Sequence, residues 1–396
     1  MGSLPCPVVD FRDTPEEAAF RADLRAWLAK NLPQDWATRE PHVGRWDESF
    51  AREWSRKLFA GGYVGLTWPK EYGGQGAPYT FQGIYLEETA RAEAPGHIGV
   101  IGLGMAGPTI AAWGSDEQKE RYLKKLLAAE EIWCQGFSEP GAGSDLASAR
   151  TRAVLDGDHW VVNGQKVWSS WAHIADWCIL VVRTDPDADR HRGLSYLLVD
   201  MHSPGVEVRP LRQITGDPEF NEIYFTDVRV PRESMLGKPG DGWQVAMTTL
   251  LHERGTLGFA LTAGLEQILG RVITTAKETG AADDPVVRDR IAQHWIDLQA
   301  LRYTNYRSIT SLMKTGVPGP EGSIAKLHWS EVTQRLTKLA LEILGPASQL
   351  DADGGWWSGY WQYWQLRSRG ATIEAGSSEI LRNIVAERVV GLPKSR

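Results

Sequence analysis

The stretch that decides the fold is Phe137-Ser-Glu-Pro-Gly-Ala-Gly-Ser-Asp145, which lies where the residue pattern of the chain changes. Before this stretch, apolar residues recur at helical spacing. After it, they alternate with polar residues, as in strands. The small residues Gly141 to Gly143 let backbone N–H groups approach a ligand, and Ser138 and Ser144 add hydroxyl donors. Taken alone, the stretch is as consistent with a plain turn as with a ligand-binding loop.

The segment upstream carries two helix-start signatures. Thr14-Pro-Glu-Glu17 combines a capping Thr, a first-turn Pro and a Glu three residues on, and Ser115-Asp-Glu-Gln118 repeats the capping pattern. Apolar residues follow each signature at helical spacing. We therefore expect an N-terminal helical domain over residues 1–130.

The segment downstream has the pattern of strands. Apolar or alternating runs occur at Trp177–Val182, Leu194–Val199 and Ile223–Val230, separated by turn residues. Asn163-Gly164 between apolar residues predicts a type I′ hairpin turn, because both residues readily take positive φ angles. We expect a middle antiparallel β-domain over residues 131–236.

Helical spacing returns after the glycine-rich turn that ends near residue 242. The pattern predicts one helix from Trp243 to about Thr279, two more over residues 286–315 and 322–345, and a last one from Ser378 to Val390. Gly391 follows that last helix as a stop signal. Residues 237–396 should thus form a C-terminal helical bundle, and the fold class is an α+β multidomain protein.

Composition excludes several classes of protein. A chain of 396 residues is too long for one core, and its net charge of −7 gives no general attraction to nucleic acid. Its three Cys have no Cys-x-x-Cys spacing and its nine His are scattered, so no disulfide framework and no metal site are expected. We find no secretory leader and no apolar run long enough to span a membrane, and expect a cytoplasmic protein.

A glycine pattern upstream imitates a dinucleotide-binding fingerprint. Gly102-x-Gly104-x-x-Gly107 has the spacing, but Pro108 follows at once and no alternation of strand and helix surrounds it. We interpret these glycines as sites of helix packing or loop residues.

Five motifs together resemble one family, the FAD-dependent acyl-CoA dehydrogenases. The resemblance runs through essentially the whole chain in the order of the family. Its motifs are Gly65–Gly74, Phe137–Asp145, Val162–Trp168, Phe225–Pro231 and Ser378–Asn383. It implies an N-terminal helical domain, a middle β-domain and a C-terminal four-helix bundle.

The resemblance also implies a reaction and a set of site residues. Such enzymes oxidise an acyl-CoA thioester to the trans-2-enoyl-CoA, with a carboxylate as base and flavin N5 as hydride acceptor. Ser144 would contact both FAD and substrate, and Arg254 would lie near the CoA nucleotide. The residues expected to bind FAD are Gln135, Phe137, Ser138, Gly143, Ser144, Trp168, Ser170, Ser377 and Glu379.

The position of the base departs from the commonest family pattern. Many relatives carry the base in a turn before the last helix, where this chain has Ala375, and a methyl group cannot take a proton. A minority, including the isovaleryl and long-chain types, place a Glu before an Arg on the first long C-terminal helix. Glu253 fits that pattern, in the middle of its predicted helix, and Glu374 is the alternative base. The backbone N–H of Ala375 would still polarise the thioester carbonyl.

Two segments that bind FAD across a subunit boundary in relatives are altered here, at Lys277–Gly280 and Leu344–Ser348. The resemblance implies a homo-oligomer, a dimer or a tetramer, but these departures leave a hetero-oligomer with a related subunit open. The electron acceptor would be an electron-transferring flavoprotein. Two alternatives are a non-catalytic or half-site partner subunit and a flavin monooxygenase on the same scaffold.

Overall fold

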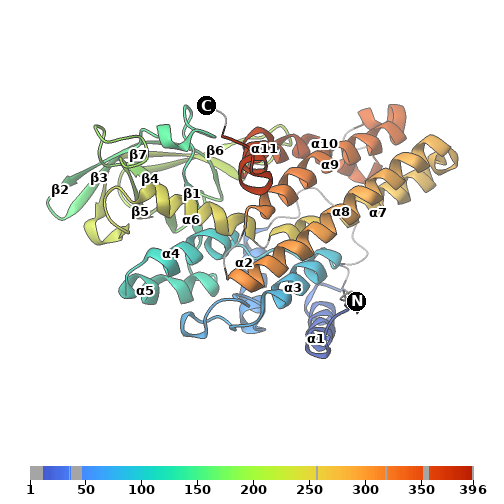
Figure 1. The fold of residues 1–396 in the computed structure, drawn as a ribbon, viewed down its shortest axis with the longest axis horizontal. Coiled ribbons are helices and arrows are strands. Elements are labelled where there is room, and N and C mark those ends of the chain that lie inside the picture. Colours follow the sequence, from blue (N-terminus) through green and yellow to red (C-terminus); the bar gives the residue numbers. More distant parts are fainter. Residues whose placement is uncertain are drawn as a thin grey trace, which may run out of the picture.

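The structure is a computed structural model that describes residues 12–34, 36, 47–255, 257–316, 319–350 and 356–394. A helical region, a sheet and a second helical region follow one another along the chain (Figure 1), so the expected α+β architecture is confirmed. The helices before the sheet are α1 (Pro15–Asn31), α2 (Glu48–Ala60), α3 (Tyr79–Arg91), α4 (Gly107–Trp113) and α5 (Asp116–Leu127).

The helix starts are capped as the sequence predicts. The hydroxyl of Thr14 accepts the N–H of Glu17 at 3.3 Å, and the Glu17 carboxylate accepts the N–H of Thr14 at 2.8 Å. The interpretation of the upstream glycines as packing sites is confirmed at Gly102 and Gly107, whereas a Cβ at Gly104 would meet no described atom within 4 Å. A Cβ at Gly107 would lie 1.9 Å from the ring of Trp68, so this glycine lets the ring pack against the helix.

The sheet has eight strands in the order β6-β7-β3-β2-β4-β5-β8, with β1 paired in parallel to β4. All other pairs are antiparallel except one parallel residue pair between β2 and β4. One edge strand, β6, contains Pro210, and the other, β8, is two residues long. The strands are β1 (Trp133–Gly136), β2 (Arg152–Asp156), β3 (His159–Ser170), β4 (Trp177–Arg183), β5 (Leu194–Asp200), β6 (Val206–Leu211), β7 (Phe220–Pro231) and β8 (Met235–Leu236).

The hairpin predicted at Asn163-Gly164 is wrong. Strand β3 continues through both residues, and the turn that joins β2 to β3 lies at Gly157, with a φ angle of 62°. Gly164 instead lies at a register shift between β3 and β7. A Cβ there would be 2.6 Å from Oγ1 of Thr151, so close approach of the neighbouring backbone explains this glycine.

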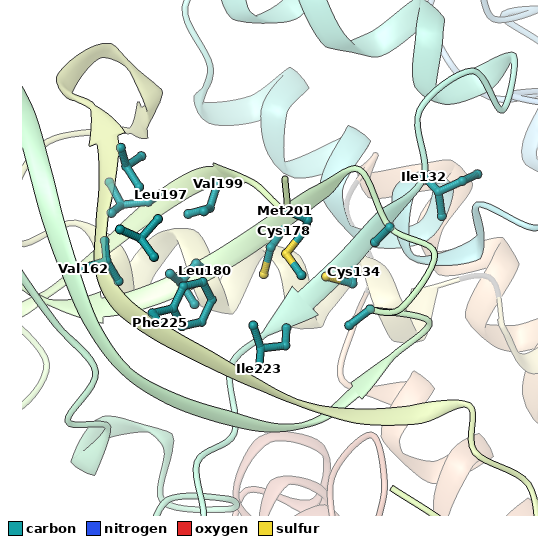
Figure 2. Close-up of a cluster of buried hydrophobic side chains, with 14 of the residues drawn as sticks. Ile132, Cys134, Val162, Cys178, Leu180, Leu197, Val199, Met201, Ile223 and Phe225 are labelled. Atoms are coloured by element: carbon teal, nitrogen blue, oxygen red, sulfur yellow. The ribbon is translucent and has the colours of Figure 1, made fainter. Parts of the chain in front are cut away.

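The central strands of the sheet, β4 and β5, are buried on both faces, whereas β2 and β6 are largely exposed. One face forms a cluster that includes Cys134, Cys178 and Phe225 (Figure 2). The other face packs through Tyr196 and its neighbours against α4, α5 and α6. This double burial explains why β4 and β5 read as continuous apolar runs rather than as alternating ones.

The last region is a helical bundle. Helices α7, α8 and α9 pack on one another and α10 packs on α9. The helix expected from Trp243 to Thr279 is described as α6 and α7, and residue 256 between them lies outside the described residues. The helices are α6 (Gly242–Gly255), α7 (Leu257–Glu278), α8 (Pro285–Thr315), α9 (Glu321–Leu344), α10 (Tyr360–Ala371) and α11 (Ser378–Ile384).

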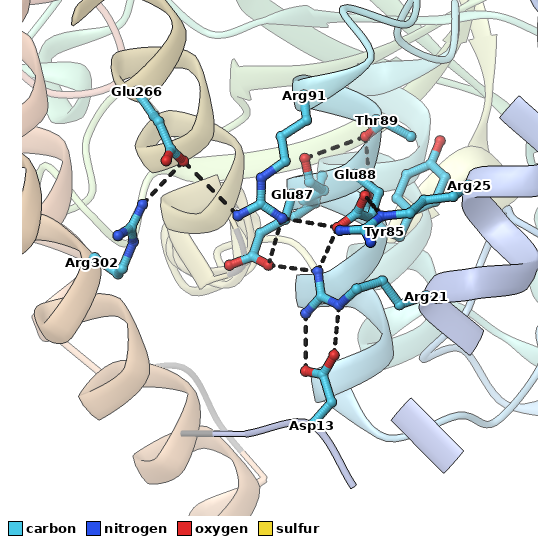
Figure 3. A network of polar contacts seen from close by, with 11 residues as sticks. Asp13, Arg21, Arg25, Tyr85, Glu87, Glu88, Thr89, Arg91, Glu266 and Arg302 are labelled. Carbon is cyan, nitrogen blue, oxygen red and sulfur yellow. Dashed lines mark hydrogen bonds and ion pairs between the residues drawn. The ribbon is translucent and has the colours of Figure 1, made fainter. Parts of the chain in front are cut away.

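A charged network ties the first helices to this bundle (Figure 3). The Glu88 side chain, only 4% exposed, lies at its centre. Its carboxylate accepts hydrogen bonds of 2.6, 2.6 and 2.9 Å from Arg21, Arg25 and Arg91. Glu266 of α7 then lies 3.9 Å from Arg91 and 3.0 Å from Arg302 of α8.

In the part of the chain that the structure describes, no helix is both long and apolar enough to cross a membrane.

Candidate functional site

The loop of residues 137–145 leaves the end of β1 and makes a tight turn. The backbones of Glu139 and Ala142 exchange two hydrogen bonds of 2.9 and 3.0 Å. Phe137 is 5% exposed, and its ring packs edge-on against Tyr196 at 5.8 Å. A Cβ at Gly141 or Gly143 would meet no described atom within 4 Å, so the tip of the loop has room for a ligand.

Strand β3 brings a second set of predicted residues beside this loop. The N–H of Val167 donates to the carbonyl of Ser138 at 2.9 Å. The strand is irregular at this point, with a register shift between Lys166 and Ser169. Trp168 has a φ angle of 62° and a 60% exposed side chain, although a left-handed backbone is costly for a residue with a Cβ. The irregularity therefore turns Trp168 outward, two residues before Ser170.

The third set of residues lies in the turn between α10 and α11. Ala375 and Gly376 have left-handed φ angles of 51° and 97°. The buried ammonium of Lys326 donates to the carbonyl of Gly376 at 2.7 Å. The Ser377 hydroxyl caps α11 by accepting the N–H of Ile380 at 3.4 Å. The turn that carries the expected Ala375 donor is thus fixed from two sides.

Glu374, the alternative base, is engaged in a forked ion pair. Nη1 and Nη2 of Arg367 donate to its two carboxylate oxygens at 3.2 and 3.0 Å. Burial acts to lower the pKa of Arg367, but Glu374 and Glu219 outweigh it and raise that pKa. The backbone carbonyl of Glu219 in turn accepts the N–H of Trp171 at 2.8 Å. Through this carbonyl Glu219 is bonded to the segment that follows β3, and its charge contributes to the raised pKa of Arg367.

A cavity of about 570 Å³ opens beside this turn. Its lining includes Ser378, the acidic side chains of Glu331 and Glu379, and four basic side chains, Arg335, Lys338, Arg369 and Arg382. The Ser378 Oγ atom is buried without a hydrogen-bond partner among the described residues. The backbone N–H of Glu379 and the hydroxyl of Ser377 both lower the pKa of the Glu379 carboxyl group. The basic side chains and the unpartnered Ser378 hydroxyl are groups that bind phosphate. Arg335 also pairs with Asp297 at 3.0 Å, and Arg382 pairs with Glu331.

Glu253 and Arg254 lie in α6, but their side chains lie outside the described residues. Expected in the middle of one long helix, Glu253 is two residues from the end of α6 as described. One turn earlier, Thr249 anchors this helix to the sheet. Its Oγ1 lies 3.0 Å from the hydroxyl of Tyr196 and 2.9 Å from Oγ1 of Thr109. Burial raises the pKa of Tyr196, so its hydroxyl is a neutral partner.

The loop tip meets a hairpin that joins β4 to β5. Asp145 forms an ion pair with Arg190 of that hairpin, and the ring of His191 lies 4.3 Å from the ring of Trp243 at the start of α6. Gly143 and Ser144, which precede Asp145 in the loop, are exposed. Gln135 lies in β1, paired with Ile179. The predicted residues of β1, of the loop and of β3 are therefore neighbours, and Ser377 and Glu379 lie on the bundle side.

The sequence interpretation missed several polar residues that support this site. Lys166, Lys326, Arg367 and Thr249 were not singled out. One of them left a signal: in β3 the alternation that buries Trp160 and Val162 puts Lys166 on the same, core-facing side. The other three lie on helices. The partners of Lys326 and Thr249 are 50 and 53 residues away, whereas Glu374 is seven residues from Arg367 across the end of α10.

Comparisons with known proteins cover the whole described chain. It matches family models described as acyl-CoA dehydrogenase N-terminal domain over residues 14–130, middle domain over 134–228 and C-terminal domain over 240–390. A relative from Mycobacterium tuberculosis, "Acyl-CoA dehydrogenase IpdE1", is 44% identical over 95% of this chain and 97% of its own. The protein of the same name from Mycolicibacterium smegmatis is 45% identical, over 96% and 98%.

Two solved structures are similar throughout. The "Tcur3481-Tcur3483 steroid ACAD" superposes with a TM-score of 0.86 and 32% identity, covering 98% of this chain and 100% of that one. The ChsE4-ChsE5 complex from Mycobacterium tuberculosis gives a TM-score of 0.84 and 32% identity with the same coverage. Both names pair two different polypeptides.

Proposed function

Because this chain belongs to the acyl-CoA dehydrogenase family, we propose that it oxidises an acyl-CoA thioester to the trans-2-enoyl-CoA with FAD as its cofactor. Bound FAD supplies the acceptor for the hydride that leaves the β-carbon. The observation that carries the proposal is the hydrogen bond from Val167 to Ser138, which holds the loop of residues 137–145 beside Trp168 and Ser170.

The described residues fit FAD. The open loop tip at Gly141 and Gly143 leaves backbone N–H groups accessible, and Ser144 beside them is exposed. The cavity beside Ser377 and Glu379 supplies basic side chains and the unpartnered Ser378 hydroxyl for phosphate groups. In this proposal Gln135, Phe137, Ser138, Gly143, Ser144, Trp168, Ser170, Ser377 and Glu379 hold the cofactor.

We assign the proton transfer to Glu253, whose carboxylate removes the α-proton of the thioester. Ala375 has no side chain that takes a proton, and Glu374 is a poor candidate because both its oxygens are engaged by Arg367. A carboxylate held by a guanidinium through both oxygens must give up that pair before it can approach a substrate carbon. The Ala375 N–H would donate to the thioester oxygen, and Ser144 and Arg254 would bind the rest of the substrate.

A matched pair of substitutions tests this assignment. Glu253→Gln keeps the shape of the side chain but removes the base, so bleaching of the flavin absorbance by an acyl-CoA should fall by about 10³-fold or more, with FAD still bound. Glu374→Gln should retain bleaching. Rapid bleaching by Glu253→Gln together with its loss in Glu374→Gln would contradict the assignment and make Glu374 the base. Wild-type protein that binds no FAD, alone or with a partner chain, would contradict the proposed function itself.

For the substrate we propose an acyl-CoA whose acyl group carries steroid-derived rings. Support comes from the name of one similar structure, a steroid ACAD, at 32% identity over 98% of this chain. A panel of short, long, branched and ring-bearing acyl-CoAs tests it by the rate of flavin reduction. Faster reduction by straight-chain substrates than by ring-bearing ones would refute this choice.

A hetero-oligomer with a related subunit is the assembly that we favour, with an electron-transferring flavoprotein as the acceptor. Two similar structures carry names that pair two chains, and this chain has altered segments at Lys277–Gly280 and Leu344–Ser348. In that assembly this chain either supplies the catalytic base or contributes only half of each active site, and the related subunit contributes the other half. Stoichiometric FAD uptake and turnover by this chain alone, in a homo-oligomer, would argue against it.

A further inference from the structure

Lys166 is a charged residue in an unusual place. Its side chain is 0% exposed, whereas lysine is almost never fully buried unless it is paired. It lies on β3, and its Nζ atom donates to the carbonyl of Phe137 at 3.0 Å and to Oε1 of Glu139 at 2.9 Å. Both acceptors belong to the loop of residues 137–145.

Glu139 completes the contact from the loop side. Its side chain is 9% exposed and accepts the N–H groups of Arg150 and Thr151 at 2.7 and 2.8 Å. Burial acts to raise the pKa of Glu139, but Lys166 and these two N–H groups outweigh it and lower that pKa. Burial lowers the pKa of Lys166, although Glu139 acts to raise it. The carboxylate links the loop to the segment that enters β2.

Three consecutive loop residues are thus tied to the sheet. Phe137 is held through its carbonyl by Lys166, Ser138 through its carbonyl by the N–H of Val167, and Glu139 through its carboxylate. A buried ion pair is seldom the most stable filling of a core, because desolvation of two charges offsets their attraction and apolar residues of similar volume often do as well. What an apolar pair cannot reproduce is the directed bond to the carbonyl of Phe137.

We propose that Lys166 is a positioning residue that holds the main chain of residues 137–139, together with Glu139, in the conformation that receives the flavin. This inference rests on the proposed function and deepens it. Lys166 acts through the loop and does not itself touch cofactor or substrate. Its loss should loosen the loop while the rest of the β-domain stays folded.

The test is the double variant Lys166→Met with Glu139→Gln, which removes both charges at nearly constant volume and so avoids stranding either one. We expect the thermal midpoint of the FAD-free protein to stay within about 5 °C of wild type. The Kd for FAD should rise by about tenfold or more, because the loop must be ordered on binding. The bound flavin should lose the fine structure of its visible absorption band. Amide hydrogens of residues 137–145 should exchange faster in the FAD-free protein.

Two further variants complete the design. Arg229→Met with Asp156→Asn removes an exposed ion pair of 2.9 Å between β7 and β2 of the same sheet, and should leave all four readouts unchanged. Glu139→Gln alone keeps an oxygen acceptor for Lys166 and should fall between wild type and the double variant in Kd and in loop exchange. It provides a second measurement if the double variant does not fold.

The outcomes separate this inference from the proposed function. Wild-type protein that binds FAD while the double variant binds it within about twofold, with unchanged exchange of the loop, would overturn the role of Lys166 alone. Glu139→Gln that is indistinguishable from wild type in both readouts would overturn the role of the ion pair. Wild type that takes up no FAD, alone or with a partner chain, would overturn both proposals.

Discussion

Ala375 shows how a single residue can keep a backbone and lose a chemical group. Its φ angle of 51° lies in the left-handed region, next to Gly376 at 97°, and Lys326 holds the carbonyl of Gly376. The turn keeps its conformation although the side chain at residue 375 is a methyl group. A main-chain donor survives such a change because it depends on φ and ψ, not on the side chain.

This geometry gives a prediction for two adjacent substitutions. Gly376→Ala should lower the free energy of unfolding by about 1–2 kcal/mol, because a Cβ is strained in the left-handed region. Ala375→Gly should change it by less than about 0.5 kcal/mol, since relief of strain is offset by the extra entropy of glycine in the unfolded chain. Urea unfolding monitored by circular dichroism measures both. Equal losses in the two variants would show that the φ angles are not the cause.

At this scale the sequence predicts which residue types are present but not how they are held. The sequence indicates a motif that contains Trp168 and Ser170. It does not predict the left-handed φ angle of Trp168, because that angle depends on a register shift between β3 and β7. The pairing of Glu374 with Arg367 was also out of reach. It requires the return of the chain from α10 through the turn, which side-chain spacing alone does not specify.

Two of the three glycines in helix α7, Gly258 and Gly270, have opposite surroundings. A Cβ at Gly270 would meet no described atom within 4 Å, whereas one at Gly258 would lie 2.2 Å from Oδ1 of Asn305. Asn305 is buried and donates to the carbonyl of Gly258 at 2.7 Å. Gly270 therefore only weakens the helix, whereas Gly258 makes room for a contact between α7 and α8.

We therefore expect opposite effects of the same substitution in one helix. Gly270→Ala should raise the free energy of unfolding by about 0.5–1 kcal/mol, the difference in helix propensity. Gly258→Ala should lower it by about 1–3 kcal/mol, because it displaces a buried, hydrogen-bonded amide. Denaturant titration of both variants under one set of conditions provides the comparison. A stabilised Gly258→Ala would mean that Asn305 moves aside without loss.

Periodicity predicted the elements well where one pattern dominated and failed where two signals competed. The capped starts of α1 and α5 were correct because capping is local. The Asn163-Gly164 hairpin was wrong because a turn signal was favoured over the strand pattern on both sides of it. The deciding contact, Thr151 against Gly164, comes from a neighbouring segment that local sequence does not reveal.

Across the whole molecule, the Glu88 network of Figure 3 joins α1 and α3 and continues to α7 and α8. Burial acts to raise the pKa of Glu88, but Arg25 and Arg21 outweigh it and hold that pKa below its ordinary value of 4.5. The stabilisation from the ionised carboxylate is therefore complete above pH 4.5 and is lost as the pH falls through the lowered pKa.

Glu88→Gln tests this coupling. At neutral pH it should lower the free energy of unfolding by about 1–3 kcal/mol, because three arginines lose a buried anion. The difference from wild type should shrink as the pH falls below about 4, where wild type also loses the charge. Urea unfolding across the pH range measures it, with Glu53→Gln in an exposed pair with Lys57 as the control. A difference that does not depend on pH would exclude the charge as its source.

The order of helical, sheet and helical regions could be predicted because the five family motifs occur along the chain in the order of the family. The links between the regions could not. Arg21 and Glu88 are 67 residues apart, and only the packing of α1 on α3 brings them together. Glu253, the proposed base, was likewise identified from a local sequence pattern and not from its surroundings.

The two edge strands of the sheet affect how the protein behaves at high concentration. A row of free backbone groups at a sheet border recruits strands from other molecules and seeds fibrils. Here one border, β8, offers two residues, and the other, β6, interrupts its row of donors with Pro210 between charged and apolar neighbours. Few consecutive backbone donors are therefore free at either border, which disfavours strand-by-strand aggregation at high concentration.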